Sequence, residues 1–111
     1  MKQFGFEVDL NKTFVYVLDA SLGLSKGKIA AQVSHVAMML SDGSKVLGRA
    51  IVLKAPHDYF EFLCGLSLCG VTSCVYVQDA GLTEVPAGTK TCVGFIRNES
   101  NARLFKDLKL L

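Results

Sequence analysis

The chain contains no tryptophan, only two prolines and no strong excess of either charge. Its net charge of +2 is too small to indicate a nucleic-acid-binding protein by itself, although a local basic patch can exist within a weak total. No apolar run reaches the roughly 18 residues that a transmembrane helix needs. The first residues, MKQFGFEVDLNKTF, include acidic residues and lack the apolar core of a secretory signal. We therefore expect a protein that has no membrane anchor and works in the cytoplasm.

Apolar residues are abundant: half of the 111 residues are hydrophobic and 20% are charged. This balance predicts a single folded domain spanning 1–111. The cysteines Cys64, Cys69, Cys74 and Cys92 lie in apolar surroundings, and the first three are spaced five apart, which matches no common zinc motif. We interpret them as reduced, partly buried thiols, with a metal or redox site as the less favoured alternative.

Hydrophobic periodicity predicts strands and helices in the order βαβαββα. The strands are expected at 13–20, 48–55, 71–79 and 89–96, and the helices at 26–41, from Pro56 to Gly70 and over NESNARLFKDLKLL at the C-terminus. Ser25 is the expected N-cap of the first helix. One apolar stripe of that helix is expected to face the core: Ile29, Val33, Val36 and Leu40. The pattern predicts an α/β domain with a mixed sheet, in which the helical crossovers give parallel pairs and one antiparallel neighbour lies at the end.

The segment SKGKIAAQVSH, residues 25–35, places lysines at the start of the predicted first helix. A helix N-terminus has free backbone N–H groups and a partial positive charge, so lysines there oppose the helix dipole. An anion would offset this conflict, and we therefore expect an anion site. Lys28, Gln32 and His35 are spaced to project from one face, whereas Lys26 lies about half a turn from Lys28. The alternative is that the lysines are solvated and the histidine is a surface or half-buried group.

Asp79 follows an apolar strand, in the segment QDAGLTEVPAGTKT. In open α/β sheets, ligands bind beyond the carboxyl ends of the strands. Asp79 and Thr83 are four residues apart in a turn-rich segment, so their carboxylate and hydroxyl can converge. In the alternative interpretation, Asp79 caps the turn and Thr83 is a structural hydroxyl.

These two segments, with IVLKA between them and LKLL at the C-terminus, resemble the second class of peptidyl-tRNA hydrolases, the archaeal and eukaryotic type. The resemblance runs from Thr13 to Leu111, and residues 1–12 are expected to form an N-terminal extension. It implies a three-layer α/β/α sandwich with a mixed, mostly parallel sheet of about four strands, often paired as a homodimer. It also implies cleavage of the ester that joins a peptide, or an N-blocked aminoacyl group, to the terminal ribose of tRNA. Peptidyl-tRNA is then the partner, and no cofactor or metal ion is implied.

Carried over residue by residue, the resemblance implies a catalytic set of Lys28, Asp79 and Thr83. The predicted substrate-binding positions are Gln32, His35, Lys54, Thr91 and Lys26. In ester hydrolysis, Asp79 would act as general base or orient Thr83 to position the water, and Lys28 would hold the oxyanion or a tRNA phosphate. His35 is a second candidate for proton transfer. Thr83 as a covalent nucleophile is a less favoured alternative.

The sequence also departs from the family pattern. Leu82 stands where the family usually has a basic residue or histidine, and Glu84 where it usually has glutamine. Both changes are expected to weaken contacts with tRNA phosphates. The segment between the first helix and IVLKA is shorter than usual. These departures keep open the alternative of a non-catalytic member of the fold that binds RNA or a protein. A further alternative, outside the resemblance, is a small-molecule enzyme that uses the same anion pocket.

Overall fold

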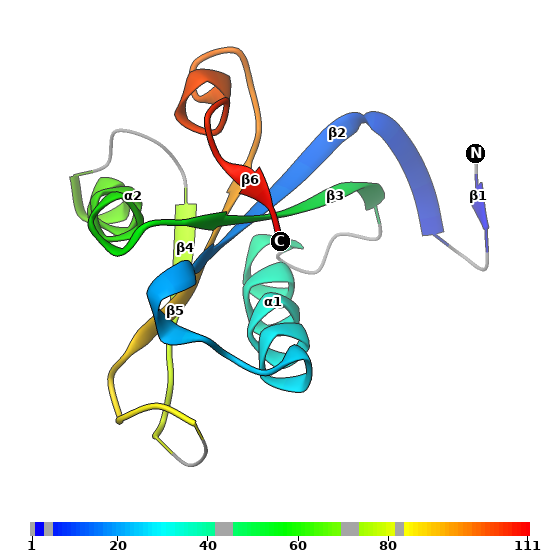
Figure 1. Cartoon of the computed structure of the whole chain (residues 1–111). Coiled ribbons are helices and arrows are strands. Elements are labelled where there is room, and N and C mark those ends of the chain that lie inside the picture. The colour runs from blue at the N-terminus through cyan, green and yellow to red at the C-terminus, as the bar shows by residue number, and fades with distance from the viewer. Residues whose placement is uncertain (1, 4–5, 42–45, 70–73, 82–83) are drawn as a thin grey trace.

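The structure, a computed structural model, describes residues 2–3, 6–41, 46–69, 74–81 and 84–111. The strands in this part of the chain are β1 (Lys2–Gln3), β2 (Phe6–Asp19), β3 (Val46–Ala55), β4 (Cys74–Gln78), β5 (Lys90–Ile96) and β6 (Lys109–Leu110). The helices are α1 (Lys26–Ser41) and α2 (His57–Cys69), with short 3₁₀ turns η1 (Ala20–Leu22) and η2 (Ala102–Leu104) (Figure 1). The bounds of α1 are those that the sequence predicts for the first helix.

The strands form one mixed sheet in the order β4-β5-β2-β3-β6, and β1 pairs with β2 beside this path. Among the described strands, β2 and β3 are the one parallel pair; β5 is antiparallel to both β2 and β4, and β6 is antiparallel to β3. The predicted mixed sheet is confirmed, but a mostly parallel sheet of about four strands is wrong. The reason is that β5 inserts between β2 and β4. The crossover from β3 through α2 therefore leads to β4, which runs in the same direction as β2. However, β4 pairs with β5 and not with β2.

The two helices lie on opposite sides of the sheet (Figure 1). Successive side chains of a strand point to opposite faces, and β2 shows this directly. Val15 belongs to the buried cluster that contains Phe60 of α2, whereas Tyr16 belongs to the cluster that contains Val36 of α1. The apolar stripe predicted for α1 is confirmed, because Val36 is fully buried and the other three members pack against the same cluster: Ile29, Val33 and Leu40.

The close approach of α1 to β5 depends on Gly94. A side chain at this position would collide with Cγ1 of Val36 and would lie 2.9 Å from Cδ1 of Leu40. Glycine therefore lets the helix rest directly on the strand. This contact holds the first turns of α1, with Lys28 and Gln32, close to β5 and to the loop that follows β4.

Both ends of the chain differ from the prediction. β2 begins at Phe6, so much of the expected N-terminal extension is part of a strand that pairs with β1 and β3. The closing helix is wrong, because the C-terminal segment contains the single turn η2 and then β6. The ring of Phe105 packs edge-on against Phe95, and the hydroxyl of Tyr59 donates to the carbonyl of Leu104 at 2.6 Å. Contacts with the sheet and with α2 thus replace the hydrogen bonds of a longer helix.

The cysteines that the structure describes are buried free thiols: Cys64, Cys74 and Cys92. This confirms their interpretation, while the side chain of Cys69 lies outside the described residues. Burial raises the pKa of Cys64 and of Cys92 to about 12. Both thiols therefore stay protonated near neutral pH, which makes them poor nucleophiles.

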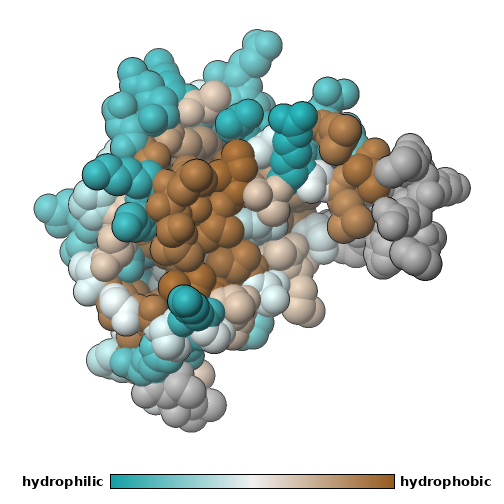
Figure 2. Space-filling view, turned by 45° about the vertical axis from the view of Figure 1, so that its right-hand side comes forward, coloured by the Kyte–Doolittle hydropathy of each residue, from teal (hydrophilic) through white to brown (hydrophobic). Residues whose placement is uncertain are grey.

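Apolar side chains also reach the surface. Figure 2 shows a broad apolar area on one face of the molecule. The large hydrophobic residues that are exposed include Met38, Leu47, Phe62, Leu110 and Leu111. In the described ranges, no helix has the length and apolar character needed to cross a membrane.

Candidate active site

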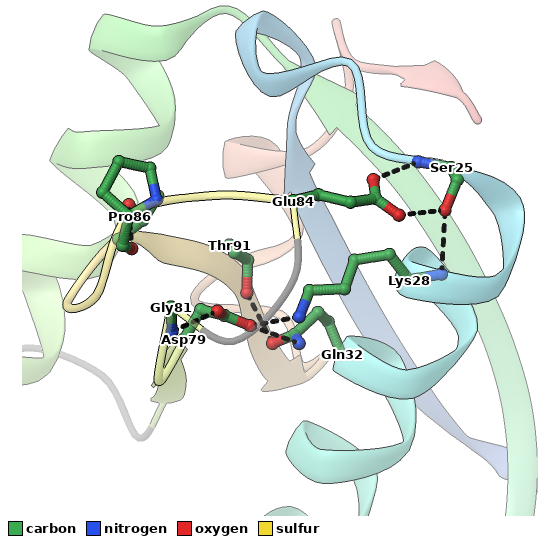
Figure 3. Close-up of polar contacts among 9 residues, drawn as sticks. Ser25, Lys28, Gln32, Asp79, Gly81, Glu84, Pro86 and Thr91 are labelled. Carbon is green, nitrogen blue, oxygen red and sulfur yellow. Dashed lines mark hydrogen bonds and ion pairs between the residues drawn. The ribbon is translucent and has the colours of Figure 1, made fainter.

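The two segments singled out in the sequence meet at one end of the sheet. Asp79 follows the last residue of β4, and Lys28 and Gln32 lie on the first two turns of α1, which packs over β4 and β5. The ammonium group of Lys28 forms an ion pair with Oδ2 of Asp79 (Figure 3). Gln32 Nε2 donates to the same oxygen at 3.2 Å. The structure thus brings Lys28 and Asp79 together, as expected.

A buried hydrogen-bonded chain supports this ion pair from the sheet. Thr91, on β5, is fully buried and donates its hydroxyl to Oε1 of Gln32 at 2.7 Å. This bond assigns the oxygen of the amide to Thr91 and turns the NH₂ group toward Asp79. Gln32 itself is 2% exposed. Both polar groups are therefore buried, and the Gln32 amide links Thr91 to Asp79.

Asp79 is also held by the loop that it opens. The Gly81 N–H donates to Oδ1 of Asp79 at 2.7 Å, and the Asp79 N–H donates to the carbonyl of Thr89 at 2.8 Å. Gly81 has a φ of +78°, and a side chain there would collide with the backbone of Ala87. Glycine is therefore required by the backbone at this point. Asp79 thus caps the turn, as the alternative interpretation expected, and also forms the ion pair with Lys28.

Three donors share the Asp79 carboxylate and keep it charged. The hydrogen bond from Lys28, followed by that from Gly81, lowers the pKa of Asp79 below its ordinary value and outweighs the opposing effect of burial. The side chains of Lys28 and Asp79 are 12% and 5% exposed. The carboxylate is a weak base in this environment, and Lys28 is the member of the pair that is more open to solvent.

Glu84 lies at the N-terminus of α1, where we expected an external anion. Its carboxylate accepts the Ser25 N–H at 2.9 Å and binds the Ser25 hydroxyl (Figure 3). Ser25 Oγ accepts the Lys28 N–H at 3.4 Å, and the Ser25 carbonyl accepts the Ile29 N–H at 2.9 Å, so Ser25 is the N-cap as predicted. The hydrogen bonds from Ser25 lower the pKa of Glu84. Glu84, which we expected to weaken contacts with tRNA phosphates, is thus hydrogen-bonded to the N-terminus of α1.

The other predicted residues that the structure describes have exposed side chains. His35 is exposed farther along α1, and Lys26 is exposed at the first residue of that helix. Lys54, near the end of β3, lines a separate cavity of about 170 Å³. Thr83, like Leu82, lies outside the residues that the structure describes.

Comparison with known proteins decides the family. The chain is 37% identical over 113 residues to the peptidyl-tRNA hydrolase of Methanopyrus kandleri, and the match covers 87% of this chain and 96% of that protein. The chain belongs to the peptidyl-tRNA hydrolase family. The match to the peptidyl-tRNA hydrolase of Thermococcus onnurineus has 33% identity over 97 residues, 71% of this chain and 78% of that protein. The match to the probable peptidyl-tRNA hydrolase 2 of Caenorhabditis elegans has 34% identity and covers 72% of this chain and 30% of that protein.

These relatives place the chain in the archaeal and eukaryotic class of the family, as the sequence motifs suggested. No family model matches the chain. A solved structure of a protein of unknown function from Agrobacterium tumefaciens has a TM-score of 0.67 and 8% identity, covering 93% of this chain and 99% of that one. At this low identity the likeness supports the fold alone.

This peptidyl-tRNA hydrolase family member has a second polar pair at the same end of the sheet, between Asp19 and His57. Asp19 ends β2 and accepts from His57 Nδ1 at 2.7 Å, from the Ser21 N–H at 2.9 Å and from the Ser21 hydroxyl at 2.7 Å. Burial opposes ionisation of Asp19, but the hydrogen bonds from Ser21 and His57 outweigh it and lower its pKa. The hydrogen bond to Asp19 raises the pKa of His57. Sequence reasoning missed this pair, although Asp19 lies near the end of one predicted strand and His57 comes shortly after the next.

Proposed function

We propose that the chain hydrolyses the ester bond between a peptide, or an N-blocked aminoacyl group, and the terminal ribose of tRNA. The observation that carries the proposal is the ion pair of Lys28 and Asp79, in a chain related to peptidyl-tRNA hydrolases over most of its length. Peptidyl-tRNA as the partner and the cytoplasm as the setting belong to the same proposal. In this proposal, side chains of the protein supply all of the catalytic groups.

In the proposed reaction, a water molecule attacks the carbonyl carbon of the ester and negative charge develops on the carbonyl oxygen. The bond to the ribose oxygen then breaks, and that oxygen takes a proton that originates from the water. Preorganised donors for the developing oxyanion supply the largest single part of such catalysis. Lys28 is the proposed donor, because its side chain is 12% exposed and the dipole of α1 adds positive potential at that end.

Asp79 is proposed to orient Lys28 rather than to remove a proton from water. A good general base has a pKa near the working pH, whereas the pKa of Asp79 is lowered and its carboxylate is shared by three donors. Thr83 stays the predicted residue for positioning the attacking water.

Gln32 and Thr91 are proposed to hold the Asp79 carboxylate in place. Because they are 2% and 0% exposed, their side chains are placed to fix the carboxylate and not to contact tRNA. Lys26, His35 and Lys54 are exposed and remain the proposed contacts to the nucleic acid. Buried apolar clusters with residues of α2 and α1 cover the two faces of the sheet, which supports the proposed three-layer sandwich. The apolar area in Figure 2 supports the proposed homodimer.

The proposal is tested by incubating the purified chain with peptidyl-tRNA and following the release of free tRNA. We expect release far above the rate in buffer, and KM is expected to rise with salt because lysines contact phosphates. Release no faster than in buffer would reject hydrolysis. A mobility shift with uncharged tRNA would then identify a non-catalytic RNA-binding member of the family.

A further inference from the structure

The capping of α1 is completed by a residue far away in the sequence. In a capping box, the N-cap serine binds the N–H of the third helical residue, and a glutamate or glutamine at that third position binds back to the N-cap N–H. Ser25 performs the first part in α1, and the third helical residue is Lys28. Lys28 cannot perform the second part, because its side chain is a cation that pairs with Asp79.

Glu84 supplies the missing half of the box. Its Oε1 accepts the Ser25 N–H at 2.9 Å, and its Oε2 binds the Ser25 hydroxyl that in turn accepts the Lys28 N–H. The first turn of α1 contains no acidic residue of its own. Glu84 is therefore the carboxylate that offsets the positive end of this helix.

The loop after β4 is consequently attached to α1 at two points. Asp79 binds the side chain of Lys28, and Glu84 binds the residue that caps the backbone of Lys28. Val85, the next residue after Glu84, is buried and anchors the loop to the body of the molecule. The position of the Lys28 ammonium group thus depends on both contacts.

We propose that Glu84 is a positioning residue: through Ser25 it fixes the first turn of α1, so that Lys28 stays in register with Asp79. The kinetic part of this inference rests on the proposed hydrolysis of peptidyl-tRNA. The competing view is that Glu84 is a surface charge that repels tRNA phosphates. The two views differ because positioning requires hydrogen bonds, whereas repulsion requires only charge.

Two variants separate hydrogen bonding from charge. Glu84→Gln removes the charge and keeps an acceptor for the Ser25 N–H, whereas Glu84→Ala removes both. We expect Glu84→Ala to lower kcat on the order of 10- to 100-fold with little change in KM, and Glu84→Gln to recover most of kcat. The double variant Ser25→Ala/Glu84→Ala should lose little more than Glu84→Ala, because the two residues act through one contact. Glu99→Ala removes an exposed carboxylate elsewhere and is the matched control.

A lower KM with unchanged kcat in both Glu84 variants would overturn the inference in favour of repulsion. Amide hydrogen exchange, measured by NMR, provides a readout that needs no activity. We expect the Ser25 and Lys28 amides to exchange faster in Glu84→Ala than in the unmodified chain, and to stay protected in Glu84→Gln and Glu99→Ala. Unchanged exchange in Glu84→Ala would overturn the positioning role. A chain that shows the exchange pattern but releases no tRNA would keep the positioning role and reject the proposed hydrolysis.

Discussion

Lys28 of α1 is paired with Asp79 of the loop after β4, and this pair is the contact around which the candidate site is built. Gln32 of α1, which is held by Thr91 of β5, donates to the carboxylate, and Gly81 donates to it from the loop. The contacts of Asp79 with Lys28 and Gln32, and of Thr91 with Gln32, join segments that are far apart in the sequence. The geometry of the site therefore depends on how closely α1, β5 and the loop pack.

Asp79→Asn tests the charge at the centre of this arrangement. Asparagine keeps the shape of the side chain but removes the negative charge that orients Lys28, so kcat is expected to fall by roughly 10²-fold or more. Because the pKa of Asp79 is lowered from its ordinary value of 3.8, its stabilising contribution is present above that value and is lost as the pH falls below it. Melting curves below pH 4 should show a steeper loss of stability for the unmodified chain than for the variant. Equal acid profiles would contradict the ion pair.

Thr91→Val tests the buried support of Asp79. The substitution keeps the shape of the side chain but leaves Oε1 of Gln32 without its buried donor, which costs about 1–3 kcal/mol in the free energy of unfolding. We also expect kcat to fall, because the Gln32 amide is then free to turn. Thr91→Ser keeps the hydroxyl and is the control. A Thr91→Val variant with unchanged kcat would show that the chain from Thr91 to Asp79 has no catalytic role.

Gly94→Ala tests the close contact between α1 and β5. The added methyl group collides with Val36 and displaces the helix, so we expect a loss of about 1–3 kcal/mol in stability. Gly27→Ala is the matched control, because a side chain there meets nothing within 4 Å on the exposed side of α1. Alanine in a helix is expected to stabilise by about 0.5–1 kcal/mol relative to glycine. Similar denaturation midpoints for the two variants would contradict the packing described for Gly94.

The pairing of His57 with Asp19 is expected to make the stability of the chain depend on pH near neutrality. Its pKa is raised above 6.5 by Asp19, so the ion pair contributes fully below that value and is lost as the pH rises through the folded-state pKa. The melting temperature of the unmodified chain should fall from pH 6 to pH 9 relative to that of His57→Gln. His35→Gln replaces the other histidine, which is exposed on α1, and is the matched control. Parallel curves for the unmodified chain and His57→Gln would refute the pair.

Local patterns in the sequence predicted the elements whose stability is local. The bounds of α1, its cap at Ser25 and its buried stripe follow from spacing and capping chemistry. The insertion of β5 between β2 and β4 does not, because strand pairing is decided by long-range burial. The closing segment has a helical pattern, but the burial of Phe105 and the pairing of β6 with β3 override it.

The candidate site also contains features that the sequence predicts and features that it does not. Motif spacing pointed to Lys28 and Asp79, and their meeting follows from placing one at a helix start and the other at a strand end. The contacts of Glu84 with Ser25 and of Asp19 with His57 were not predictable, because nothing in the spacing relates a loop carboxylate to a distant donor.

Turnover of N-acetyl-aminoacyl-tRNA, compared with the free-amine form, tests the central claim most directly. We expect the N-blocked substrate to be hydrolysed and the free-amine form to be left largely intact. Lys28→Ala should lower kcat by roughly 10²- to 10³-fold, while Lys106→Ala, which removes an exposed lysine outside the cluster, should match the unmodified chain. No hydrolysis of the N-blocked substrate, or equal rates with and without the Lys28 side chain, would contradict the account.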